Sequence, residues 1–365
     1  MDYKDLLRPP YRIAKSIWEW HIKNITNLQL LFHLIPMSPP KPKVQKSRKI
    51  KKILLAMMKY DYGIKERGLS LEYYNTYLPL KELGYEVEMF DFMTVLQDQG
   101  RKKMNSLLFD TVVEFDPDLV FFSLFQEQFD KNTVRKISET TRSITLNWFS
   151  DDDWRFYLFS KFWAPCFNFC ITTHEESYLR YISLGYTNII MSQFAANPSI
   201  CKKLKIKKDI NVSFVGAAHG LRKSFIELLN GQGILVQCFG SGWKNGRVSQ
   251  DEMMSIFNRS KINLNLCTSS TKSSVQMKAR LFEIPACGAF MLTDYVYPLE
   301  KYFELNKEIC IFDNPSNAAE KIRYYLSHDR EREQIASSGY TRCLTEHTYI
   351  HRLRSIISEI EHRGC

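Results

Sequence analysis

Short apolar segments typical of buried strands alternate with helical segments along most of the chain, and this alternation begins twice. The first run starts at 50–58 and the second at 211–215, with a polar connector at 197–209 between them. Strands that alternate with helices form parallel sheets joined by right-handed crossovers. The sequence therefore predicts an α/β fold of two Rossmann-like, doubly wound domains facing a cleft, where the ligands of such sheets bind. Further strands are expected at 85–90, 118–124, 144–149 and 167–172, and then at 234–239, 262–266, 289–292 and 309–312.

The 365 residues are enough for two domains of ordinary size, each with its own core. We expect a basic amphipathic arm and a Pro-rich linker over 1–47, a first domain over 48–205 and a second over 206–346. The last segment, 347–365, is predicted to be a helix that can cross back to the first domain. Other helices are expected at 70–83, 104–115, 222–229, 318–326 and 331–341.

The formal net charge of +10 lies entirely in residues 1–60, which hold 13 Lys or Arg and 3 Asp or Glu. A nucleic-acid-binding enzyme usually carries basic residues across its globular face, so we expect no nucleic acid partner. An apolar stripe with Trp18 precedes seven basic residues between Lys41 and Lys52. Two interpretations stay open: the arm binds an anionic membrane surface, or its helix packs on the first domain.

No apolar run is long enough to cross a bilayer, and the first residues lack the layout of a secretory signal. The nine cysteines form no CxxC pair and no regular framework, which is typical of reduced thiols. We therefore expect a cytoplasmic protein, peripheral on the inner face of the cell membrane if the arm binds lipid.

The most informative motif is RLFEIPACGAFMLTD at 280–294, a helix that ends in small residues, then a strand and a polar turn. Glu283 is expected on the helix that leads into the cleft, where a carboxylate can accept both hydroxyls of a ribose. Arg280 lies one turn earlier and can meet a diphosphate. Thr293 and Asp294 end the strand. The alternative is that Glu283 is a surface carboxylate paired with a neighbouring cation.

This motif and the stretches 68–91, 147–156, 211–216 and 347–353 resemble the spore-maturation-type (CgeB-like) branch of nucleotide-sugar glycosyltransferases. The resemblance covers roughly residues 50–355. It implies the two-Rossmann GT-B architecture, with the acceptor in the first domain and the donor in the second. It also implies that Glu283, which precedes the Ala-Cys-Gly turn, holds the donor ribose. The large retaining families carry another Glu eight residues earlier, where this chain has Val275.

A second anion site is expected where GAAHGLRK, residues 216–223, joins a strand to a helix. Backbone N–H groups at such a helix start point at phosphate, and two basic side chains add charge. The next strand ends in Gly-Ser-Gly-Trp, whose Trp either lines the base pocket or packs in the core. The residues assigned to donor binding are thus Gly216, His219, Arg222, Lys223, Gly240, Trp243, Arg280, Glu283, Thr293 and Asp294.

The candidate catalytic residues follow strands of the first domain. Asp151, Asp152 and Asp153 come directly after one strand, and His174 comes after the next. The carboxylates are interpreted as a base toward an acceptor hydroxyl, as ligands of a divalent metal, or as helix N-caps. We expect no metal and no other cofactor, because cationic side chains and a helix N-terminus can neutralise a leaving diphosphate.

The function predicted from these patterns is transfer of a sugar from a nucleotide-diphosphate donor to a cell-envelope or surface-glycan acceptor, which can be lipid-linked. The alternative is a non-catalytic nucleotide- or sugar-binding protein with a degenerate GT-B site. The presence of Val275 in place of the first Glu supports this alternative. The sequence lacks the GxGxxG expected after a first strand in NAD-dependent enzymes. It also lacks GxSxG, P-loop and zinc patterns, which argues against those enzyme classes.

Overall fold

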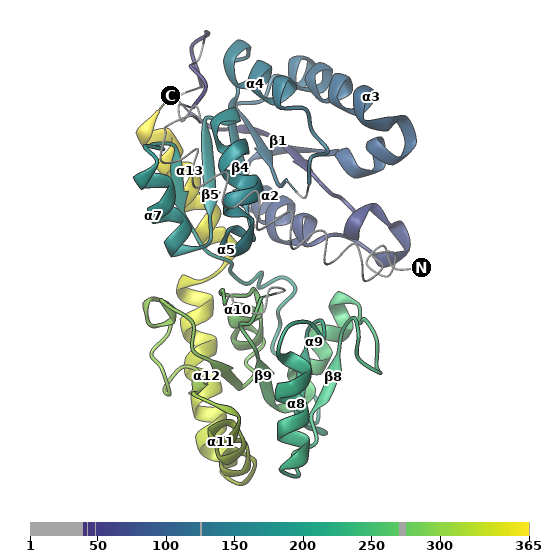
Figure 1. Ribbon diagram of the computed structural model, residues 1–365, viewed down its shortest axis with the longest axis vertical. Coiled ribbons are helices and arrows are strands. Elements are labelled where there is room, and N and C mark those ends of the chain that lie inside the picture. The colour runs from purple at the N-terminus through teal and green to yellow at the C-terminus, as the bar shows by residue number, and fades with distance from the viewer. Residues whose placement is uncertain (1–38, 42, 48, 125, 270–274, 365) are drawn as a thin grey trace.

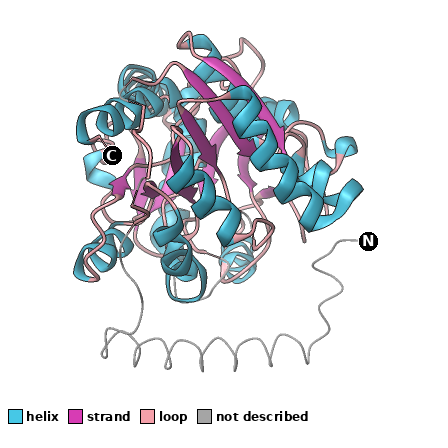
Figure 2. Ribbon diagram, turned by 90° about the horizontal axis from the view of Figure 1, so that it is seen from above, coloured by secondary structure: helices cyan, strands magenta, loops and turns pink. Residues whose placement is uncertain are grey.

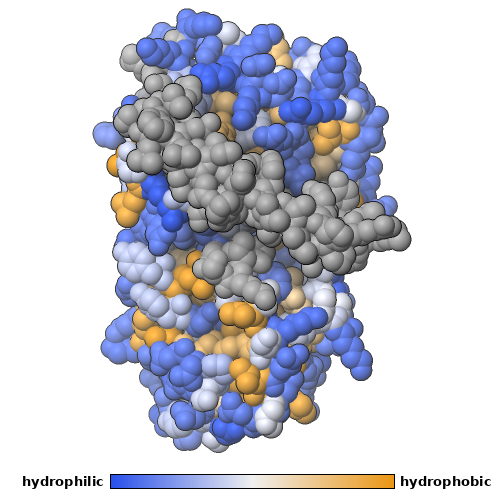
Figure 3. Space-filling view, viewed as in Figure 1, coloured by the Kyte–Doolittle hydropathy of each residue, from blue (hydrophilic) through white to orange (hydrophobic). Residues whose placement is uncertain are grey.

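The computed structural model describes residues 39–41, 43–47, 49–124, 126–269 and 275–364, and it has two lobes stacked along its long axis (Figure 1). The first lobe is built on a sheet of six parallel strands and the second on a sheet of five. Helices surround both sheets (Figure 2). On the face seen in Figure 3, hydrophilic side chains predominate over the upper lobe, whereas hydrophobic ones gather on the lower lobe. The predicted α/β fold of two doubly wound domains is confirmed.

The first sheet has the strand order β2-β1-β3-β4-β5-β6. Successive residues of β1 point to opposite faces, so Leu54 and Ala56 enter one core cluster while Ile53 and Leu55 enter another. The strand order reverses between β1 and β3, which is the switch point where open parallel sheets bind ligands. The strands are β1 (Lys52–Met57), β2 (Glu86–Asp91), β3 (Leu119–Phe122), β4 (Ile144–Phe149), β5 (Phe169–Thr172) and β6 (Ile189–Met191).

Helices pack on both faces of this sheet. The sequence predicted a helix over 104–115, but the structure extends it back to Phe92, with a break at Gly100, whose φ is 77°. Glycine adopts this left-handed conformation at low cost, which allows the two parts to follow one another. The helices are α2 (Leu78–Glu82), preceded by a π-helical turn at Tyr73–Tyr77, α3 (Phe92–Phe115), α4 (Lys131–Thr140), α5 (Asp152–Arg155), α6 (Lys161–Trp163) and α7 (Glu175–Ser183).

The second sheet has the strand order β11-β10-β9-β7-β8, so its switch point lies between β7 and β9. Its strands are β7 (Ile210–Val215), β8 (Gln237–Phe239), β9 (Ser260–Asn265), β10 (Met291–Asp294) and β11 (Cys310–Phe312). Its helices are α8 (Arg222–Gly231), α9 (Gln250–Arg259), α10 (Arg280–Ala286), α11 (Pro315–Ser327) and α12 (Asp329–Glu346).

The last helix, α13 (Tyr349–Arg363), leaves the second lobe and packs against the first (Figure 1). Leu353 and Ile356 enter the core cluster that also holds Ile53 of β1. Two backbone hydrogen bonds hold the crossing, from Ala196 N to His347 O at 3.0 Å and from Tyr349 N to Ala196 O at 2.9 Å. The lobes are therefore linked by the connector after Ala196 and by the segment that enters α13.

The eight cysteines in the described part of the chain are all buried and none forms a disulfide. No helix within the described ranges is both long and apolar enough to span a membrane. Residues 1–38, which hold most of the predicted amphipathic arm, lie outside the described residues.

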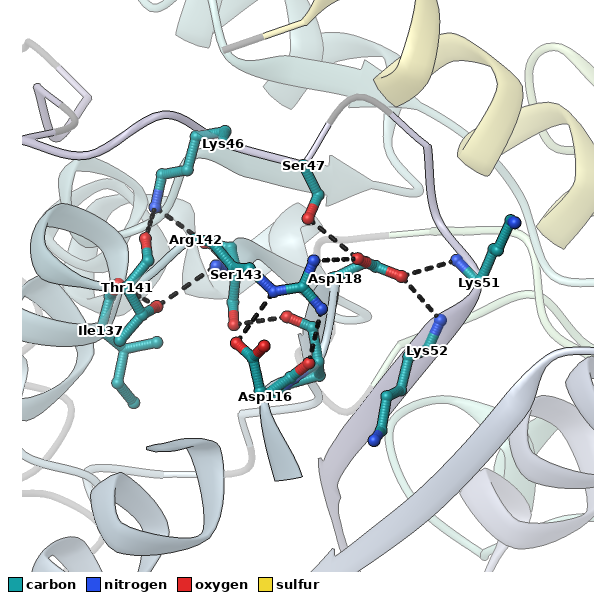
Figure 4. A network of polar contacts seen from close by, with 11 residues as sticks. Lys46, Ser47, Lys51, Lys52, Asp116, Asp118, Ile137, Thr141, Arg142 and Ser143 are labelled. Carbon is teal, nitrogen blue, oxygen red and sulfur yellow. Dashed lines mark hydrogen bonds and ion pairs between the residues drawn. The ribbon is translucent and has the colours of Figure 1, made fainter. Parts of the chain in front are cut away.

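Part of the basic segment Lys41–Lys52 is built into the first lobe (Figure 4). Lys46 is buried, and its Nζ donates a hydrogen bond to the Ser143 carbonyl oxygen at 2.7 Å. The Asp118 carboxylate accepts from the backbone N of Lys52 at 2.9 Å. The hypothesis that all seven basic residues meet an acidic surface is therefore wrong for Lys46, because its ammonium group is already solvated by carbonyl groups of the protein.

Candidate functional site

The carboxyl ends of the two sheets face each other at the junction between the lobes, and polar contacts cross it. Gln276, between β9 and α10, donates from Nε2 to Asp151 Oδ1 at 2.9 Å. Arg247, after β8, forms an ion pair with Asp61, after β1, at 2.6 Å. We call this region the lobe junction. It joins the switch points of both sheets, where ligand binding is expected.

Arg222 opens α8 and lies almost completely buried at the switch point of the second sheet. Its Nη2 donates to the carbonyl oxygens of Leu266 at 2.9 Å and Thr268 at 2.8 Å, and its Nη1 donates to Ala217 O at 3.1 Å. Burial lowers the pKa of Arg222 to about 10, and the nearby Arg280 adds to this effect. The guanidinium group therefore links the loop after β7 to the loop after β9, next to the predicted anion site.

The loops after β7 and β8 are in direct contact. A Cβ atom on Gly240, whose φ is 126°, would lie 2.4 Å from the carbonyl oxygen of Gly216. Trp243 Nε1 donates to the same carbonyl oxygen at 2.7 Å, and its ring meets Phe214 edge to face. Trp243 thus fixes the position of the Gly216 loop, and only glycine fits at position 240.

Arg280 and Glu283 lie together on α10, as the sequence predicted from their spacing. Arg280 Nε donates to the carbonyl oxygen of Val215, at the end of β7. Glu283 is buried, and no described residue donates a hydrogen bond to its carboxylate. Burial raises the pKa of Glu283, and the charge of Arg280 opposes this rise. This placement does not support the alternative in which Glu283 is a surface carboxylate.

Thr293 and Asp294 end β10 beside the same edge. The Asp294 carboxylate accepts from Cys267 N at 2.8 Å, and Thr293 Oγ1 accepts from Asn265 Nδ2 at 2.9 Å. Burial raises the pKa of Asp294. Both side chains therefore hold the loop after β9 in place, next to Arg222.

The remaining predicted donor residues differ in exposure. His219 Nε2 lies 3.2 Å from Arg222 Nη1, within the loop between β7 and α8. Lys223 is exposed on α8. A cation that the sequence analysis missed lies closer to the junction: burial lowers the pKa of Lys278, and the charges of Asp151 and Asp153 oppose this effect. No short motif marks Lys278, because it becomes important only when the two lobes are brought together.

Two buried polar atoms near the end of β9 have no hydrogen-bond partner among the described residues. They are Ser269 Oγ and Gln276 Oε1, and both residues are at most 3% exposed. Buried polar groups in folded proteins are nearly always hydrogen-bonded, so these two atoms can each take a hydrogen bond from a water or a ligand.

The three consecutive aspartates lie in three different environments. Asp151 faces the second lobe through its contact with Gln276. Asp152 is fully buried inside the first lobe, where Tyr181 donates to its Oδ2 at 3.3 Å, and burial raises its pKa to about 7. Asp153 lies close enough to Lys278 to raise the pKa of that lysine. Asp151 and Asp153 are therefore near the junction, whereas the Asp152 side chain lies in the protein interior.

His174 precedes α7, and its Nδ1 lies 3.0 Å from Ser177 Oγ. Burial lowers the pKa of His174, although Asp153 opposes this effect. Within the described residues, no group of three or more His, Cys, Asp or Glu side chains is arranged to hold a metal ion.

Comparisons with known proteins agree with this geometry. A family model described as glycosyl transferase-like matches residues 222–358, which contain the Arg222 and Glu283 side of the junction. HepE from Anabaena, solved with UDP and glucose, superposes with a TM-score of 0.58 over 85% of this chain and 100% of that chain, at 11% identity. The chain has the GT-B fold.

Two further structures share the fold at low sequence identity. Sucrose-phosphate synthase from Thermosynechococcus elongatus has a TM-score of 0.59, with 9% identity over 86% of this chain and 98% of that chain. The DNA-modifying β-glucosyltransferase, studied with its substrate uridine diphosphoglucose, has a TM-score of 0.54 and 13% identity over 86% of this chain and 98% of that chain. A comparison with curated proteins gives no significant match. The spore-maturation branch is named in none of these comparisons and stays a prediction.

Proposed function

We propose that this protein transfers a sugar from a nucleoside-diphosphate-sugar donor, bound in the second lobe, to a hydroxyl acceptor that enters from the first lobe. The observation that carries the proposal is the group of buried polar atoms without hydrogen-bond partners at the carboxyl ends of β7 and β9. Ser269 Oγ and Gln276 Oε1 are buried there without partners among the described residues, beside Arg222 and Lys278. Related folds solved with UDP or uridine diphosphoglucose support this donor class.

In this proposal each part of the edge has a separate role. The N–H groups of Gly216, Ala218 and His219 already donate to carbonyl oxygens. The Lys278 ammonium group and the remaining N–H groups of the 216–220 loop therefore meet the diphosphate, and the buried Glu283 accepts the ribose hydroxyls. Arg222 is a positioning residue, because the N–H groups of its guanidinium already donate hydrogen bonds to carbonyl oxygens of the protein. The contacts across the junction limit the access of water to the reacting groups, which makes hydrolysis slower than transfer.

The experiment is a nucleotide screen followed by an activity assay on the full chain. UDP, GDP and ADP are added in a thermal-shift measurement, where a bound ligand raises the apparent melting temperature by mass action. Release of the nucleoside diphosphate is then measured from UDP-glucose, UDP-N-acetylglucosamine and GDP-mannose. We expect one nucleotide to stabilise the protein and its sugar conjugate to be cleaved. Binding without release would favour the alternative of a degenerate, non-catalytic site.

We also propose that this release needs no divalent metal, since Lys278, Arg280 and the α8 start supply positive charge near the leaving diphosphate. Activity should be unchanged in EDTA. Activity that disappears in EDTA and returns with Mn²⁺ would contradict this and would make Asp151 and Asp153 candidate ligands.

The acceptor is proposed to be a growing cell-envelope or surface glycan, with a lipid-linked form as one case. The basic residues of 1–60, apart from the buried Lys46, are proposed to hold the protein on the anionic inner face of the membrane. Full-length protein should sediment with anionic vesicles at low salt, and a chain that starts at Ser47 should not. Equal sedimentation of both proteins would contradict the role of the arm.

A further inference from the structure

The first sheet has its own switch point, between β1 and β3, and none of the residues predicted from sequence lies there. Ligands of open parallel sheets bind outside the carboxyl ends of the strands at this point. Asp151 follows β4, one strand further along the sheet. A group that acts on the acceptor is therefore expected near the residues that end β1 and β3.

Glu72 reaches this switch point from the helical segment after β1. It directly precedes the π-helical turn at Tyr73–Tyr77, and it is partly buried. Ser123, the residue after β3, donates from Oγ to Glu72 Oε1 at 3.4 Å. Ser70 Oγ donates to Met58 O at 2.5 Å, so the start of this segment is fixed to the end of β1. The Glu72 carboxylate is thus held over the carboxyl ends of both strands.

The neighbouring loop connects Glu72 to the second lobe. Asp61 pairs with Arg247 across the junction at 2.6 Å. Tyr62 has a left-handed φ of 54°, a conformation that bulky residues rarely adopt and that occurs preferentially at functional sites. The carboxylates of Asp61, Glu72 and Asp151 all act on the Tyr62 hydroxyl and, after burial, raise its pKa. Glu72 and Asp151 therefore both lie near the Tyr62 hydroxyl, beside the loop whose Asp61 contacts the donor lobe.

We propose that Glu72 is the general base that accepts the proton of the acceptor hydroxyl. This inference rests on the proposed glycosyl transfer. As the hydroxyl oxygen forms a bond to the anomeric carbon, its O–H bond breaks and the proton moves to the Glu72 carboxylate. The bond from the anomeric carbon to the phosphate oxygen breaks at the same time, and its electron pair leaves with the diphosphate. A single displacement of this kind inverts the anomeric configuration.

The environment of Glu72 suits this role better than those of Asp151 and Asp152. Asp151 accepts a hydrogen bond of 2.9 Å from Gln276 of the other lobe, whereas the contact of Glu72 with Ser123 is longer, at 3.4 Å. The Asp152 side chain is enclosed in the first lobe. Burial raises the pKa of Glu72, the hydroxyls of Ser70 and Ser123 offset part of this rise, and the charge of Asp61 adds to it. A raised pKa makes a carboxylate a stronger proton acceptor.

The test compares Glu72→Gln with Glu66→Gln, an exposed residue on the preceding turn. UDP-glucose is the donor, water is the acceptor, and UDP release is measured alongside UDP affinity. We expect Glu72→Gln to lower the release rate about 100-fold or more, with UDP affinity unchanged within about threefold, since general bases typically contribute that much to rate. Glu66→Gln should match the wild type. The glucose released should carry the inverted, β configuration before it mutarotates.

The possible failures are distinguishable. A folded Glu72→Gln variant that keeps more than about a tenth of the rate, or a product with retained configuration, would overturn the inference and leave the transfer proposal standing. No release of a nucleoside diphosphate by the wild type from this donor or the others screened would overturn the transfer proposal itself. If Glu72→Gln does not fold, Glu72→Asp is compared with the wild type in a pH profile. If Glu72 is the base, the pH at which the rate falls on the acid side of the profile should shift in Glu72→Asp. An unshifted pH would contradict the inference.

Discussion

The Arg222 guanidinium group donates a 2.9 Å hydrogen bond to the carbonyl oxygen of Leu266, and so joins the first turn of α8 to the end of β9. The same side chain also reaches Ala217 and Thr268. A buried cation that links the two sides of a switch point in this way determines the shape of the space between them.

Replacing Arg222 with Met should therefore damage both stability and donor binding. Each hydrogen bond of a charged group contributes about 1.5–3 kcal/mol, so we expect a loss of about 2–4 kcal/mol in the free energy of unfolding. UDP affinity should fall at least about tenfold, which corresponds to about 1.4 kcal/mol. Urea unfolding and calorimetry measure the two effects. Arg330→Met, at an exposed position of α12, is the control and should change neither. Unaltered stability of the Arg222 variant would contradict the proposed role.

Gly240→Ala tests the contact between the β7 and β8 loops. The new Cβ would lie 2.4 Å from Gly216 O, at a φ of 126° that L-residues rarely adopt. We expect the loops to separate, with UDP binding lost and stability lowered by about 1–3 kcal/mol. Gly231→Ala is a matched control, because a Cβ there meets nothing within 4 Å. A Gly240→Ala protein that binds UDP like the wild type would show that this contact does not shape the site.

Asp152 should make stability depend on pH. Burial raises its pKa to about 7, from about 3.9 in an unfolded chain. Between these values the folded protein binds more protons than the unfolded one, so this residue lowers stability as pH rises from about 4 to 7. Asp152→Asn has no proton to lose. Its stability relative to the wild type should rise through this window, by at most about 1.4 kcal/mol per pH unit, and stay constant above it.

Urea unfolding from pH 4.5 to 8 measures this difference. The control is Asp98→Asn, which removes a carboxylate from the exposed side of α3. If the difference for Asp152→Asn is independent of pH, the carboxyl titrates normally in the folded protein and our account of its burial is wrong.

The strand pattern could be predicted from the sequence because it depends on local composition. The run 144–149 forms β4 within the expected bounds, since all six side chains are buried and the segment is uniformly apolar or neutral. β6 was missed because its apolar run is only three residues long, whereas β8 and β11, which also have three residues each, lie in the longer runs 234–239 and 309–312. Helices α4, α7 and α9 were also missed, although α4 and α9 begin with a side-chain N-cap that the sequence contains.

The candidate site was less predictable, because its geometry depends on strand order and on the contact between lobes. Arg222 was expected to face phosphate, but its donors are directed at the Leu266 and Thr268 carbonyl oxygens. No short motif marks Lys278, and Glu72 was assigned no role although it lies in the stretch 68–91. Their significance follows from the switch points of the two sheets, and strand order is not encoded in any local pattern.

Glu283→Gln tests the ribose assignment. The amide keeps the size of the side chain but lacks the charge that strengthens hydrogen bonds from ribose hydroxyls. We expect UDP affinity to fall about tenfold with the melting temperature kept, and Glu227→Gln, exposed on α8, to match the wild type. Calorimetry that finds equal UDP affinity for both variants would mean that the ribose binds elsewhere.

The central claim is that the donor nucleotide binds at the switch point of the second sheet, and hydrogen–deuterium exchange with saturating UDP tests it most directly. We predict slower exchange at 216–222 and 276–283 on UDP binding, because these segments lie at the edge that holds Ser269 Oγ and Gln276 Oε1, two atoms without a hydrogen-bond partner among the described residues. We predict much smaller changes in β2 and α3, at the far edge of the first lobe. Protection confined to the first lobe, or none in either segment of the second lobe at saturation, would contradict the central claim.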